Sequence, residues 1–542
     1  MTSSDRQDAD LRTPAHPAAT LPGLLADSAS RHGDRLAIAW QETSWTYAQL
    51  LAESERVAAS LSTLGVGPGT RVGVLLPNWP EVFALVFGAT RLGATVVALN
   101  TMATAAELGF YLDHAEVTHL AFTPAFLRHD YEARLAEVVA ERPAVGTRLR
   151  TRIAVRPDGP LSAGVIDYAT LCAPGTEALP ANRSRPNDPA MIFFTSGSTA
   201  RPKGVVHAHR SLVHQAYTLP VRFGLEPTDR VWGALPMFFT GGFVIMALSA
   251  LGSGAGLVLQ DHFEAGAALD LMERHDITLY AGWQLAQALV DHPSFATRRL
   301  SLRKGIWSDM PAAARLLAPD HRTVAVYGMS ETATCVTQAD FRDPAEVRVR
   351  GFGRPTPGVE LDLIDPATGT SVPVGETGEI RVRGPSLMLG YLGVPAAETF
   401  DPDGFFRTGD FGRLDSDGTL LFDGRLKEVI KTAGVNVAAA EVEACVATAD
   451  GVRFAFVVPV PHPERGENVA AFVVAEPGRA VEPATILTHC RRELASYKVP
   501  RHLFALAEAD IPRTGTHKVD KPALRARAGE LAGSAADLLA SS

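Results

Sequence analysis

One eleven-residue stretch, Thr195-Ser196-Gly197-Ser198-Thr199-Ala200-Arg201-Pro202-Lys203-Gly204-Val205, is the most informative part of this sequence. It follows the apolar run 191–194, which is typical of a buried strand. Its hydroxyls, its backbone N–H groups and the ammonium of Lys203 are groups that bind a polyphosphate. The spacing of a Walker loop is absent. A flexible Ser/Gly linker is the other interpretation, but such linkers rarely follow a strand and end in Pro-Lys-Gly. The stretch therefore predicts a phosphate-binding loop after a buried strand.

Helix and strand patterns alternate along the N-terminal part of the chain. The amphipathic stretch 46–64 ends at Gly65, which predicts a helix and its stop. Next come a predicted strand, helix and strand at 71–76, 81–92 and 95–99. The alternation continues from 191 to about 316, and a further strand is expected at 324–327. This order is typical of a parallel sheet covered by helices.

The C-terminal part of the chain has a different pattern. Between Gly353 and Phe422 the apolar runs are short and glycine turns are frequent, which predicts a small antiparallel β subdomain. After Gly424 a new α/β pattern predicts helices at 441–448 and 484–494, strands at 454–460 and 469–474, and a terminal helix after Ala523. The predicted fold class is therefore α/β, with a large N-terminal domain of parallel α/β layers, a small β subdomain and a small C-terminal α/β domain.

Length and composition narrow the possible functions. A chain of 542 residues is too long to fold around one ordinary hydrophobic core, so two or more domains are expected. The net charge of −9, without a basic stripe, argues against a nucleic-acid partner. Four scattered cysteines without a C-x-x-C pair suggest neither a zinc site nor a disulfide framework, and they fit a cytoplasmic protein. Residues 1–19 predict a disordered tail rather than a signal peptide, and no membrane span is predicted.

Three further motifs carry possible chemistry. In Tyr327-Gly328-Met329-Ser330-Glu331-Thr332 an aromatic ring and a carboxylate suit a base-stacking face and a Mg²⁺ ligand, and a turn in which Ser330 caps a helix is the alternative. In Arg407-Thr408-Gly409-Asp410 the carboxylate suits a ribose diol, and a turn aspartate is the alternative. The turn 512–519 presents Lys518, which by itself is typical of a solvated surface lysine.

Together, these motifs and Gly424-Arg425-Leu426-Lys427 closely resemble the adenylate-forming superfamily in order and spacing. That superfamily includes acyl-CoA synthetases, adenylation domains of nonribosomal peptide synthetases and beetle luciferases. The resemblance runs from about residue 21 to 525. It implies an ATP-dependent, AMP-forming ligase that joins an acid to ATP, giving an adenylate and pyrophosphate, with Mg²⁺ and local groups holding the nucleotide.

The resemblance also implies a role for each motif residue. The β- and γ-phosphates would be held by Thr195, Ser196, Ser198, Thr199 and Lys203, with Gly197 in the same loop. Tyr327 would flank adenine, Glu331 would bind Mg²⁺, and Gly328, Ser330 and Thr332 complete that nucleotide-binding motif. The ribose would be held by Asp410 and Arg425. Lys518 would be the catalytic residue, because it would bridge the attacking acid and the α-phosphate.

A hinged domain organisation follows from the same resemblance. The tail would span 1–19, the N-terminal adenylate-forming domain 20–424, the hinge 425–427 and a mobile C-terminal lid domain 428–542. Lys427 is the expected hinge residue. Rotation about it would withdraw Lys518 and bring the loop 431–436 toward the adenylate, so that one active site serves two half-reactions.

Several positions beside the acid and its acceptor depart from the family pattern. Phe239 stands where acyl-CoA ligases usually carry His. Trp307, Ser308 and Asp309 fall in a run that is usually Gly-Gly-Ala-Pro, so Trp307 would fill the acid pocket. Asp309 either accepts a hydrogen bond from an amine or caps the helix that starts at Pro311. In the loop that lines the thiol tunnel, Ala433-Gly434 replaces a usual Gly-Gly, and this narrows the tunnel only slightly.

Two enzymatic interpretations follow from these departures. The first is a ligase that transfers a small or aromatic acid to CoA, with Trp307 and Phe239 excluding long fatty chains. The second is an ATP-dependent diazotase, which activates nitrite and passes it to an aryl amine. A third interpretation is a nonenzymatic nucleotide sensor. Such a protein would not need Lys518, Glu331 and Asp410 together. The expected partners are therefore a small-molecule acid and an acceptor, CoA or an aryl amine, and the protein is expected to be a monomer or homodimer.

Replacing Lys518 tests the catalytic assignment. We expect Lys518→Ala to abolish adenylate formation, because a well-placed donor at the transition state contributes several kcal/mol. The measurement is ATP–pyrophosphate exchange in the presence of a substrate acid. Exchange close to that of the unmodified protein would refute the assignment.

Overall fold

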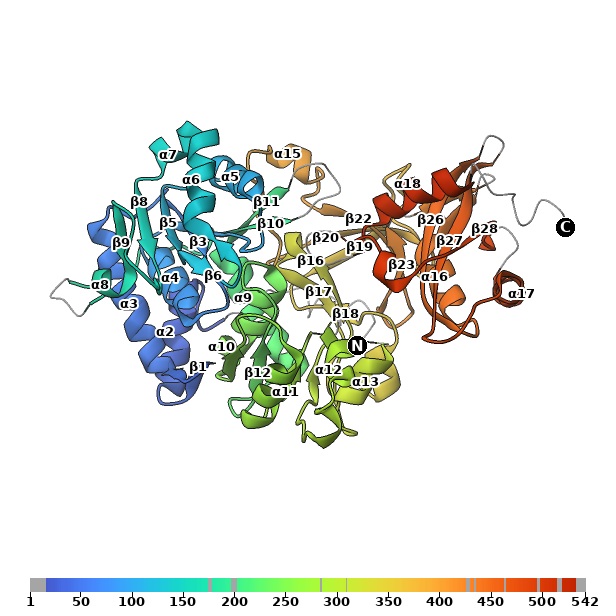
Figure 1. Cartoon of the computed structure of the whole chain (residues 1–542), viewed down its shortest axis with the longest axis horizontal. Helices are drawn as coiled ribbons and strands as arrows, with labels where there is room; N and C mark the ends of the chain where they lie inside the picture. Colours follow the sequence, from blue (N-terminus) through green and yellow to red (C-terminus); the bar gives the residue numbers. More distant parts are fainter. Residues whose placement is uncertain are drawn as a thin grey trace, which may run out of the picture. The chain divides into compact units, whose positions relative to one another are not determined.

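The computed structural model of the protein describes residues 16–173, 178–195, 202–282, 285–308, 310–425, 429–432, 435–462, 465–494, 498–513 and 519–532. The chain forms two compact units (Figure 1). The first consists of Met1–Leu361 and Val382–Phe406, and the second of Asp362–Arg381 and Arg407–Ser542. The hinge expected at 425–427 stays a prediction, and 426–428 lie outside the described residues.

An eight-stranded sheet forms one half of the first unit. Its strand order is β21-β11-β10-β4-β3-β5-β8-β9. The strands are β3 (Arg71–Leu75), β4 (Thr95–Ala98), β5 (His119–Phe122), β8 (Thr151–Ala154), β9 (Val165–Asp167), β10 (Pro189–Thr195), β11 (Lys203–Ala208) and β21 (Gly390–Tyr391). From β10 to β9 all pairs are parallel, which confirms the βαβ expectation. At the other edge β11 and β21 are antiparallel, which the sequence pattern does not predict.

A six-stranded sheet forms the other half, in the order β15-β14-β12-β13-β1-β2. Its strands are β1 (Leu36–Trp40), β2 (Thr43–Thr46), β12 (Arg230–Gly233), β13 (Gly256–Leu259), β14 (Leu279–Tyr280) and β15 (Lys304–Gly305). The pairs from β1 to β15 are parallel, so the alternation predicted from 191 to 316 is confirmed. The strand β1, from the start of the chain, completes this second sheet by pairing with β13.

Helix α4 (Pro80–Arg91) lies in the main core. Every residue from Pro80 to Thr90 is buried, as expected of a helix that is apolar on most of its surface. The same core cluster takes side chains from both sheets, including Phe193 of β10 and Leu257 of β13. Gly88 allows α3 (Tyr47–Thr63) to cross α4 closely, because a Cβ there would lie 2.8 Å from the Ser54 carbonyl oxygen.

The helix predicted at 46–64 is α3, and its start is fixed by a capping box. The Thr46 hydroxyl accepts from the Gln49 backbone N–H at 3.2 Å, and the Gln49 side chain accepts from the Thr46 N–H at 2.8 Å. Figure 1 shows α2 (Leu21–His32), α3 and α4 side by side in blue. The Tyr47 hydroxyl donates to the Ala255 carbonyl at 2.7 Å, which joins α3 to the start of β13.

The remaining elements of the first unit are mostly short. The helices are α5 (Ala105–His114), α6 (Tyr131–Glu141), α7 (Pro143–Arg148), α8 (Tyr168–Leu171), α9 (His209–Phe223), α10 (Ser249–Ser253), α11 (Ala265–Arg274), α12 (Ala286–Asp291), α13 (Pro311–Leu316), α14 (Ala345–Val349) and α15 (Ala396–Thr399), with the π-helix η1 (Gly241–Leu248) and the 3-10 helices η3 (Phe295–Thr297) and η4 (Ser330–Thr332). The short strands are β6 (Ala125–Phe126) and β7 (His129–Asp130).

The strand expected at 324–327 begins two residues later than predicted. The strand is β16 (Val326–Met329), and it pairs antiparallel with β17 (Thr334–Gln338), which pairs with β18 (Arg354–Pro355). Val324 forms only an isolated parallel bridge to Ile306. The apolar run alone does not distinguish these pairings, because pairing direction depends on which strand lies alongside.

The short strands predicted between 353 and 422 are present. They include β19 (Glu360–Ile364), β20 (Gly378–Arg383), β22 (Phe406–Leu414) and β23 (Leu420–Arg425), which form one sheet in this order. The β22–β23 pair is antiparallel. Gly418, in the turn between these two strands, has a φ of 81°, a value that favours glycine.

The second unit contains a five-stranded sheet with helices on both faces. Its strands are β24 (Val429–Thr432), β25 (Val435–Ala438), β26 (Val452–His462), β27 (Gly466–Ala475) and β28 (His502–Ala505). Alternate residues of β27 enter two clusters: Ala471 packs in the cluster of α16 (Ala439–Ala447) and α17 (Pro483–Glu493), and Phe472 packs in that of α18 (Lys521–Ala532). The predicted C-terminal helices and strands are therefore confirmed. Among the described residues, no helix is both long and apolar enough to span a membrane.

A buried charge pair links the six-stranded sheet to the end of α9. Asp229 is 4% exposed, and its carboxylate accepts from the Lys304 ammonium and the Thr278 hydroxyl, both at 2.7 Å. The Lys304 ammonium also donates to the carbonyl oxygen of Gly224, the left-handed residue that ends α9. Removing the lysine would leave a buried carboxylate without its charge partner.

We expect Lys304→Met to lower the stability of the first unit by about 3 kcal/mol, the usual effect of breaking one side of a buried ion pair. The control is Arg31→Met, which removes the exposed pair with Asp27 and should cost less than about 1 kcal/mol. Urea unfolding followed by tryptophan fluorescence measures both changes. Equal effects of the two substitutions would contradict the expectation.

Candidate functional site

The two ends of the predicted phosphate-binding loop are held together as a strand pair. Thr195 ends β10 and Lys203 begins β11, and the two residues are partners in the antiparallel register. The run 191–194 is a buried strand, as the sequence predicts. The loop residues between these ends, including Ser196, Gly197, Ser198 and Thr199, lie outside the described residues, so their phosphate-binding role stays a prediction.

The ammonium of Lys203 lies over an aromatic ring that the sequence analysis does not identify. Its Nζ is 4.5 Å from the ring centroid of Tyr391. Tyr391 lies on β21, opposite Val205 of β11, so Lys203 and Tyr391 are diagonal neighbours across one strand pair. A cation over the face of an aromatic ring is attracted by the ring quadrupole. Lys203 is thus held in place without a carboxylate partner among the described residues.

The carboxylate of Glu331 contacts the same tyrosine. The Tyr391 hydroxyl donates to Glu331 Oε1 at 2.8 Å, and the Glu331 carbonyl accepts from the Met388 N–H at 2.9 Å. Partial burial and the neighbouring carboxylate raise the pKa of the Tyr391 hydroxyl well above its ordinary value, because both disfavour the phenolate. The tyrosine therefore remains a hydrogen-bond donor at neutral pH.

Buried polar side chains hold the turn that carries Glu331. The His207 Nε2 lies 2.7 Å from the carbonyl oxygen of Ser330, so this nitrogen carries the proton and donates. Burial lowers the pKa of His207 to about 4, and the ring is neutral at neutral pH. The Gln215 amide donates to the carbonyl oxygens of Thr332, Ala333 and Cys335 at 3.3, 3.0 and 2.8 Å.

The backbone of this turn has an unusual conformation. Ala333 and Thr334 have φ values of 46° and 82°, in the left-handed region that Thr rarely adopts. A Cβ at Gly328 would overlap the carbonyl oxygen of Thr334, so glycine is required there. Ser330 begins the 3-10 helix η4, and its hydroxyl lies 3.4 Å from that of Thr240. The alternative in which Ser330 caps a helix is therefore wrong, since Met329 occupies the N-cap position.

The ring predicted to flank adenine is buried and lies within β16. Tyr327 is 7% exposed, and its ring packs edge-on against Phe352, with the ring centroids 6.5 Å apart. Its contact with adenine stays a prediction. Gly328 and Thr332, from the same motif, shape the turn: the Thr332 hydroxyl donates to the Thr334 carbonyl at 2.6 Å.

The residues expected around the acid lie on two separate segments. Phe239 is half-buried and packs against Phe238, with the ring centroids 4.6 Å apart, just before the π-helix η1. Short π-helical segments are frequent at functional sites. Trp307 is half-buried after β15, and its backbone N–H donates to the Val324 carbonyl at 2.9 Å. Thr240, next to Phe239, contacts Ser330, so one of these segments adjoins the Glu331 turn.

One of the two alternatives for Asp309 expects this residue to cap α13. The N-cap of this helix is Met310, whose N–H donates to the Ser308 hydroxyl at 3.2 Å. Asp309 itself lies outside the described residues, so its contact with an amine stays a prediction. The same is true of Ala433 and Gly434, although the hairpin that carries them is defined by the pairing of Lys431 with Asn436.

The predicted ribose residues are cross-strand partners in the second unit. Asp410 of β22 lies directly opposite Arg425 of β23. Asp410 is 2% exposed and lies within a strand, so the turn-aspartate alternative is wrong. Its N–H donates to the Thr408 hydroxyl at 3.1 Å, which in turn donates to the Ile380 carbonyl at 2.7 Å. Lys427 and Lys518 lie outside the described residues.

The described side chains fit a magnesium ion that arrives with a nucleotide. Among them, no cluster of three or more His, Cys, Asp or Glu residues could form a complete metal cage. Magnesium is commonly bound by one or two carboxylates together with substrate phosphates. Glu331 offers one carboxylate near Lys203, a phosphate-binding candidate, and this arrangement suits such an ion.

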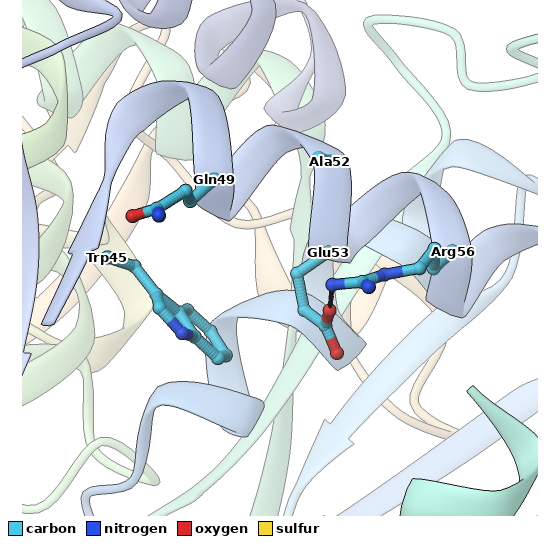
Figure 2. Close-up of a pocket in the computed structure, with 5 residues that line it drawn as sticks. All are labelled: Trp45, Gln49, Ala52, Glu53 and Arg56. Atoms are coloured by element: carbon cyan, nitrogen blue, oxygen red, sulfur yellow. Dashed lines mark hydrogen bonds and ion pairs between the residues drawn. The ribbon is translucent and has the colours of Figure 1, made fainter. Parts of the chain in front are cut away.

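A separate surface hollow contains none of these motifs. It has a volume of about 310 Å³ and lies beside α3 (Figure 2). Its lining residues are Trp45, Gln49, Ala52, Glu53 and Arg56. Glu53 pairs with Arg56 and also accepts from the Tyr168 hydroxyl at 2.9 Å, so the charged groups at this hollow are already partnered.

Comparisons with known proteins agree with the motif analysis. A family profile described as "AMP-binding enzyme" matches residues 25–392, and one described as "AMP-binding enzyme C-terminal domain" matches residues 441–518. A sulfoacetate–CoA ligase from Cupriavidus necator is 30% identical over 93% of this chain and 96% of its own length. A feruloyl-CoA synthase from Amycolatopsis is 33% identical over 93% and 96%.

A solved structure shares the fold. The anthranilate CoA ligase AuaEII, in complex with anthranoyl-AMP, superposes with a TM-score of 0.82 at 25% identity. The match covers 99% of this chain and 100% of that chain. A mixed α/β fold with a large N-terminal and a small C-terminal domain is therefore established for this protein.

Replacing His207 tests whether the turn must be held in place for nucleotide binding. We expect His207→Leu to weaken Mg-ATP binding about tenfold, because the Ser330 carbonyl loses its donor and the turn is no longer fixed. His207→Gln, whose amide can still donate, should retain most of the affinity. Calorimetric titration with Mg-ATP measures the change.

The matched control is His119→Leu, since His119 is also buried and its Nε2 lies 3.1 Å from the Leu64 carbonyl, away from the motifs. It should leave the affinity for Mg-ATP unchanged. A similar loss in both leucine variants would indicate general destabilisation and contradict the positioning role of His207.

Proposed function

The chain belongs to the AMP-binding enzyme family, and from this membership we propose that it is an ATP-dependent acid–CoA ligase. One observation at the site supports the proposal most directly. A phosphate-binding lysine candidate and a metal-binding carboxylate candidate, Lys203 and Glu331, are both fixed on Tyr391. An enzyme that transfers an adenylyl group needs both functions at the same polyphosphate.

In the proposed first half-reaction an oxygen of the acid attacks the α-phosphorus of ATP, and pyrophosphate leaves. Negative charge builds on the phosphoryl oxygens and must be stabilised in place. We assign Lys203, Thr195 and the loop between them to the β- and γ-phosphates, and Lys518 to the α-phosphate and the attacking acid. Glu331 would hold Mg²⁺, which supplies charge neutralisation when bound with the nucleotide.

The adenosine half of the nucleotide would be bound by groups on β16, β22 and β23. We assign Tyr327 to adenine. We assign the cross-strand pair Asp410 and Arg425 to the ribose, because a fixed carboxylate accepts both hydrogen bonds of a diol. Lys427 is the proposed hinge between an N-terminal domain at 20–424 and a lid at 428–542.

In the proposed second half-reaction the acyl group passes from AMP to the thiol of CoA. Two relatives are by name a CoA ligase and a CoA synthase, and both align over nearly their whole length with this chain. We assign Ala433 and Gly434, which lie in the sequence between the paired strands β24 and β25, to the thiol route.

We propose that the acid is small or aromatic. Phe239 and Trp307 are bulky, half-buried side chains at the positions expected to border the acid, and they would shorten the pocket. The names of the relatives include both kinds of acid, sulfoacetate and ferulate, and that of the structural neighbour is anthranilate. The aromatic ring of Phe239 excludes a histidine-like polar role at that position.

The diazotase is the second candidate, and Phe239 is the observation that favours it. Nitrite is small enough for a filled acid pocket, and a reaction without a thiol would not need the histidine that CoA ligases usually carry there. The two candidates differ in the acid they activate and in the acceptor on which AMP release depends.

A substrate panel tests the proposal. We expect AMP release from Mg-ATP to require a small or aromatic acid together with CoA, and to be poor with palmitate, whose chain would overlap Trp307. The panel includes ferulate, anthranilate, sulfoacetate, palmitate and nitrite, each with and without CoA and with and without an aminobenzoate. Chromatography of AMP and of the acyl product measures each reaction.

Each outcome of the panel identifies one function. AMP release that depends on nitrite and the aminobenzoate would replace the ligase by the diazotase. Efficient activation of palmitate would refute the short pocket. Failure of every acid to support AMP release, with Mg-ATP still bound, would favour the nucleotide sensor.

A further inference from the structure

Tyr391 joins two motifs that are far apart in the sequence. The ammonium of Lys203 lies over its ring, and its hydroxyl donates to Glu331 Oε1 at 2.8 Å. Lys203 and Glu331 both contact Tyr391 rather than each other. The tyrosine comes from neither motif, since it lies on β21, more than fifty residues after Glu331.

The backbone of Tyr391 is fixed on the strand that carries the lysine. The Leu389 N–H donates to the Val206 carbonyl at 2.8 Å, and the Leu392 N–H donates to the Gly204 carbonyl at 2.7 Å. Gly390 has a φ of 145°, which an L side chain rarely adopts, while a Cβ there would meet nothing within 4 Å. Glycine is thus required by the backbone conformation, and that conformation sets the position of the next side chain.

Opposite charges that lie close together at a partly buried site tend to pair directly. A direct ion pair would neutralise both Lys203 and Glu331, and each would then have to give up its partner before binding phosphate or metal. A tyrosine supplies each charge with a suitable neutral partner, a ring face for the cation and an O–H donor for the anion. It also leaves the carboxylate with lone pairs for a metal, because an ionised carboxylate accepts at both oxygens.

We propose that Tyr391 is a positioning residue for Mg-ATP, which keeps Lys203 and Glu331 apart and orients each toward its own part of the nucleotide. The inference rests on the proposed function, because it assumes that Lys203 meets phosphate and Glu331 meets magnesium. It adds a residue and a mechanism that the motif roles do not contain. The hydroxyl acts on the metal side, and the ring acts on the phosphate side.

The hydroxyl of Tyr391 can be removed alone or together with the ring. Tyr391→Phe keeps the ring under Lys203 and removes only the donor to Glu331. Tyr391→Leu removes both contacts. The matched control is Tyr217→Phe, because the Tyr217 hydroxyl donates to the Asp27 carboxylate at the same distance, 2.8 Å, but on α9 and α2, outside the motifs. All variants are compared by thermal unfolding, so that a change in folding is recognised.

Binding of Mn²⁺ in place of Mg²⁺ gives a readout that does not need turnover. Free Mn²⁺ is measured by electron paramagnetic resonance while the full chain is titrated in the presence of a non-hydrolysable ATP analogue. We expect Tyr391→Phe to weaken Mn²⁺ binding about tenfold, the effect of losing a hydrogen bond to a charged group. Tyr217→Phe should bind Mn²⁺ as the unmodified chain does. In the steady state the half-saturating Mg²⁺ concentration of Tyr391→Phe should rise, with an unchanged KM for ATP at saturating Mg²⁺.

Metal-free ATP tests the ring separately. With EDTA present, Tyr391→Phe should bind ATP normally, whereas Tyr391→Leu should bind it about fivefold more weakly, because Lys203 loses its ring and pairs with Glu331. Adding Glu331→Gln to Tyr391→Leu removes that competing carboxylate and should restore most of the lost affinity for metal-free ATP. No restoration would overturn the proposed separation of the two charges.

The results distinguish this inference from the proposed function. If the unmodified chain binds Mn²⁺ with the ATP analogue but Tyr391→Phe binds it equally well, the positioning role is refuted and the proposed function stands. If Tyr217→Phe loses as much affinity as Tyr391→Phe, the effect is general and the positioning role is also refuted. If the unmodified chain binds neither the analogue nor Mn²⁺ with it, the proposed function fails, and the inference fails with it.

Discussion

The pairing of β11 with both β10 and β21 is the constraint on which the candidate site depends. The first pair brings Thr195 and Lys203 opposite each other, so a strand register joins the two ends of the predicted phosphate-binding loop. The second pair brings Tyr391 diagonally across from Lys203. Both pairs are antiparallel additions at the edge of a parallel sheet, and they place polar groups at the end of the buried apolar strand β10.

The turn at Glu331 depends on buried side chains that donate hydrogen bonds to its backbone. His207 and Gln215 lie on β11 and α9, and they donate to four carbonyl oxygens of the turn between Ser330 and Cys335. A buried donor without a partner is unfavourable, so these side chains favour only the turn conformation that accepts all of their hydrogen bonds. The left-handed Thr334 shows that this conformation differs from the one that the local sequence prefers.

Sequence patterns predicted the regular elements well and left some of the strand pairings unassigned. The helix at 46–64 carries its own capping box and stop, and α3 follows the prediction within two residues. A strand was expected at 324–327 without an assigned neighbour, and β16 pairs antiparallel with β17. The apolar pattern contains no information about the neighbouring strand. At the site, the motif residues Lys203, Glu331 and Asp410 were identified by their order and spacing. Tyr391 and His207 were not, since an isolated aromatic residue in a turn-rich segment and a histidine inside an apolar strand give no local signal of a role.

The sequence by itself determined the family, the alternation of helices and strands, and the chemical types available at the site. These properties depend on residues that are close in the chain, where periodicity, glycine turns and short motifs are visible. Only the tertiary structure decided which of these groups meet: Lys203 and Glu331 on the two sides of Tyr391, and Asp410 opposite Arg425. The reason is that a strand register and a buried hydrogen bond are set by the packing of distant segments, and a local pattern does not specify its partner.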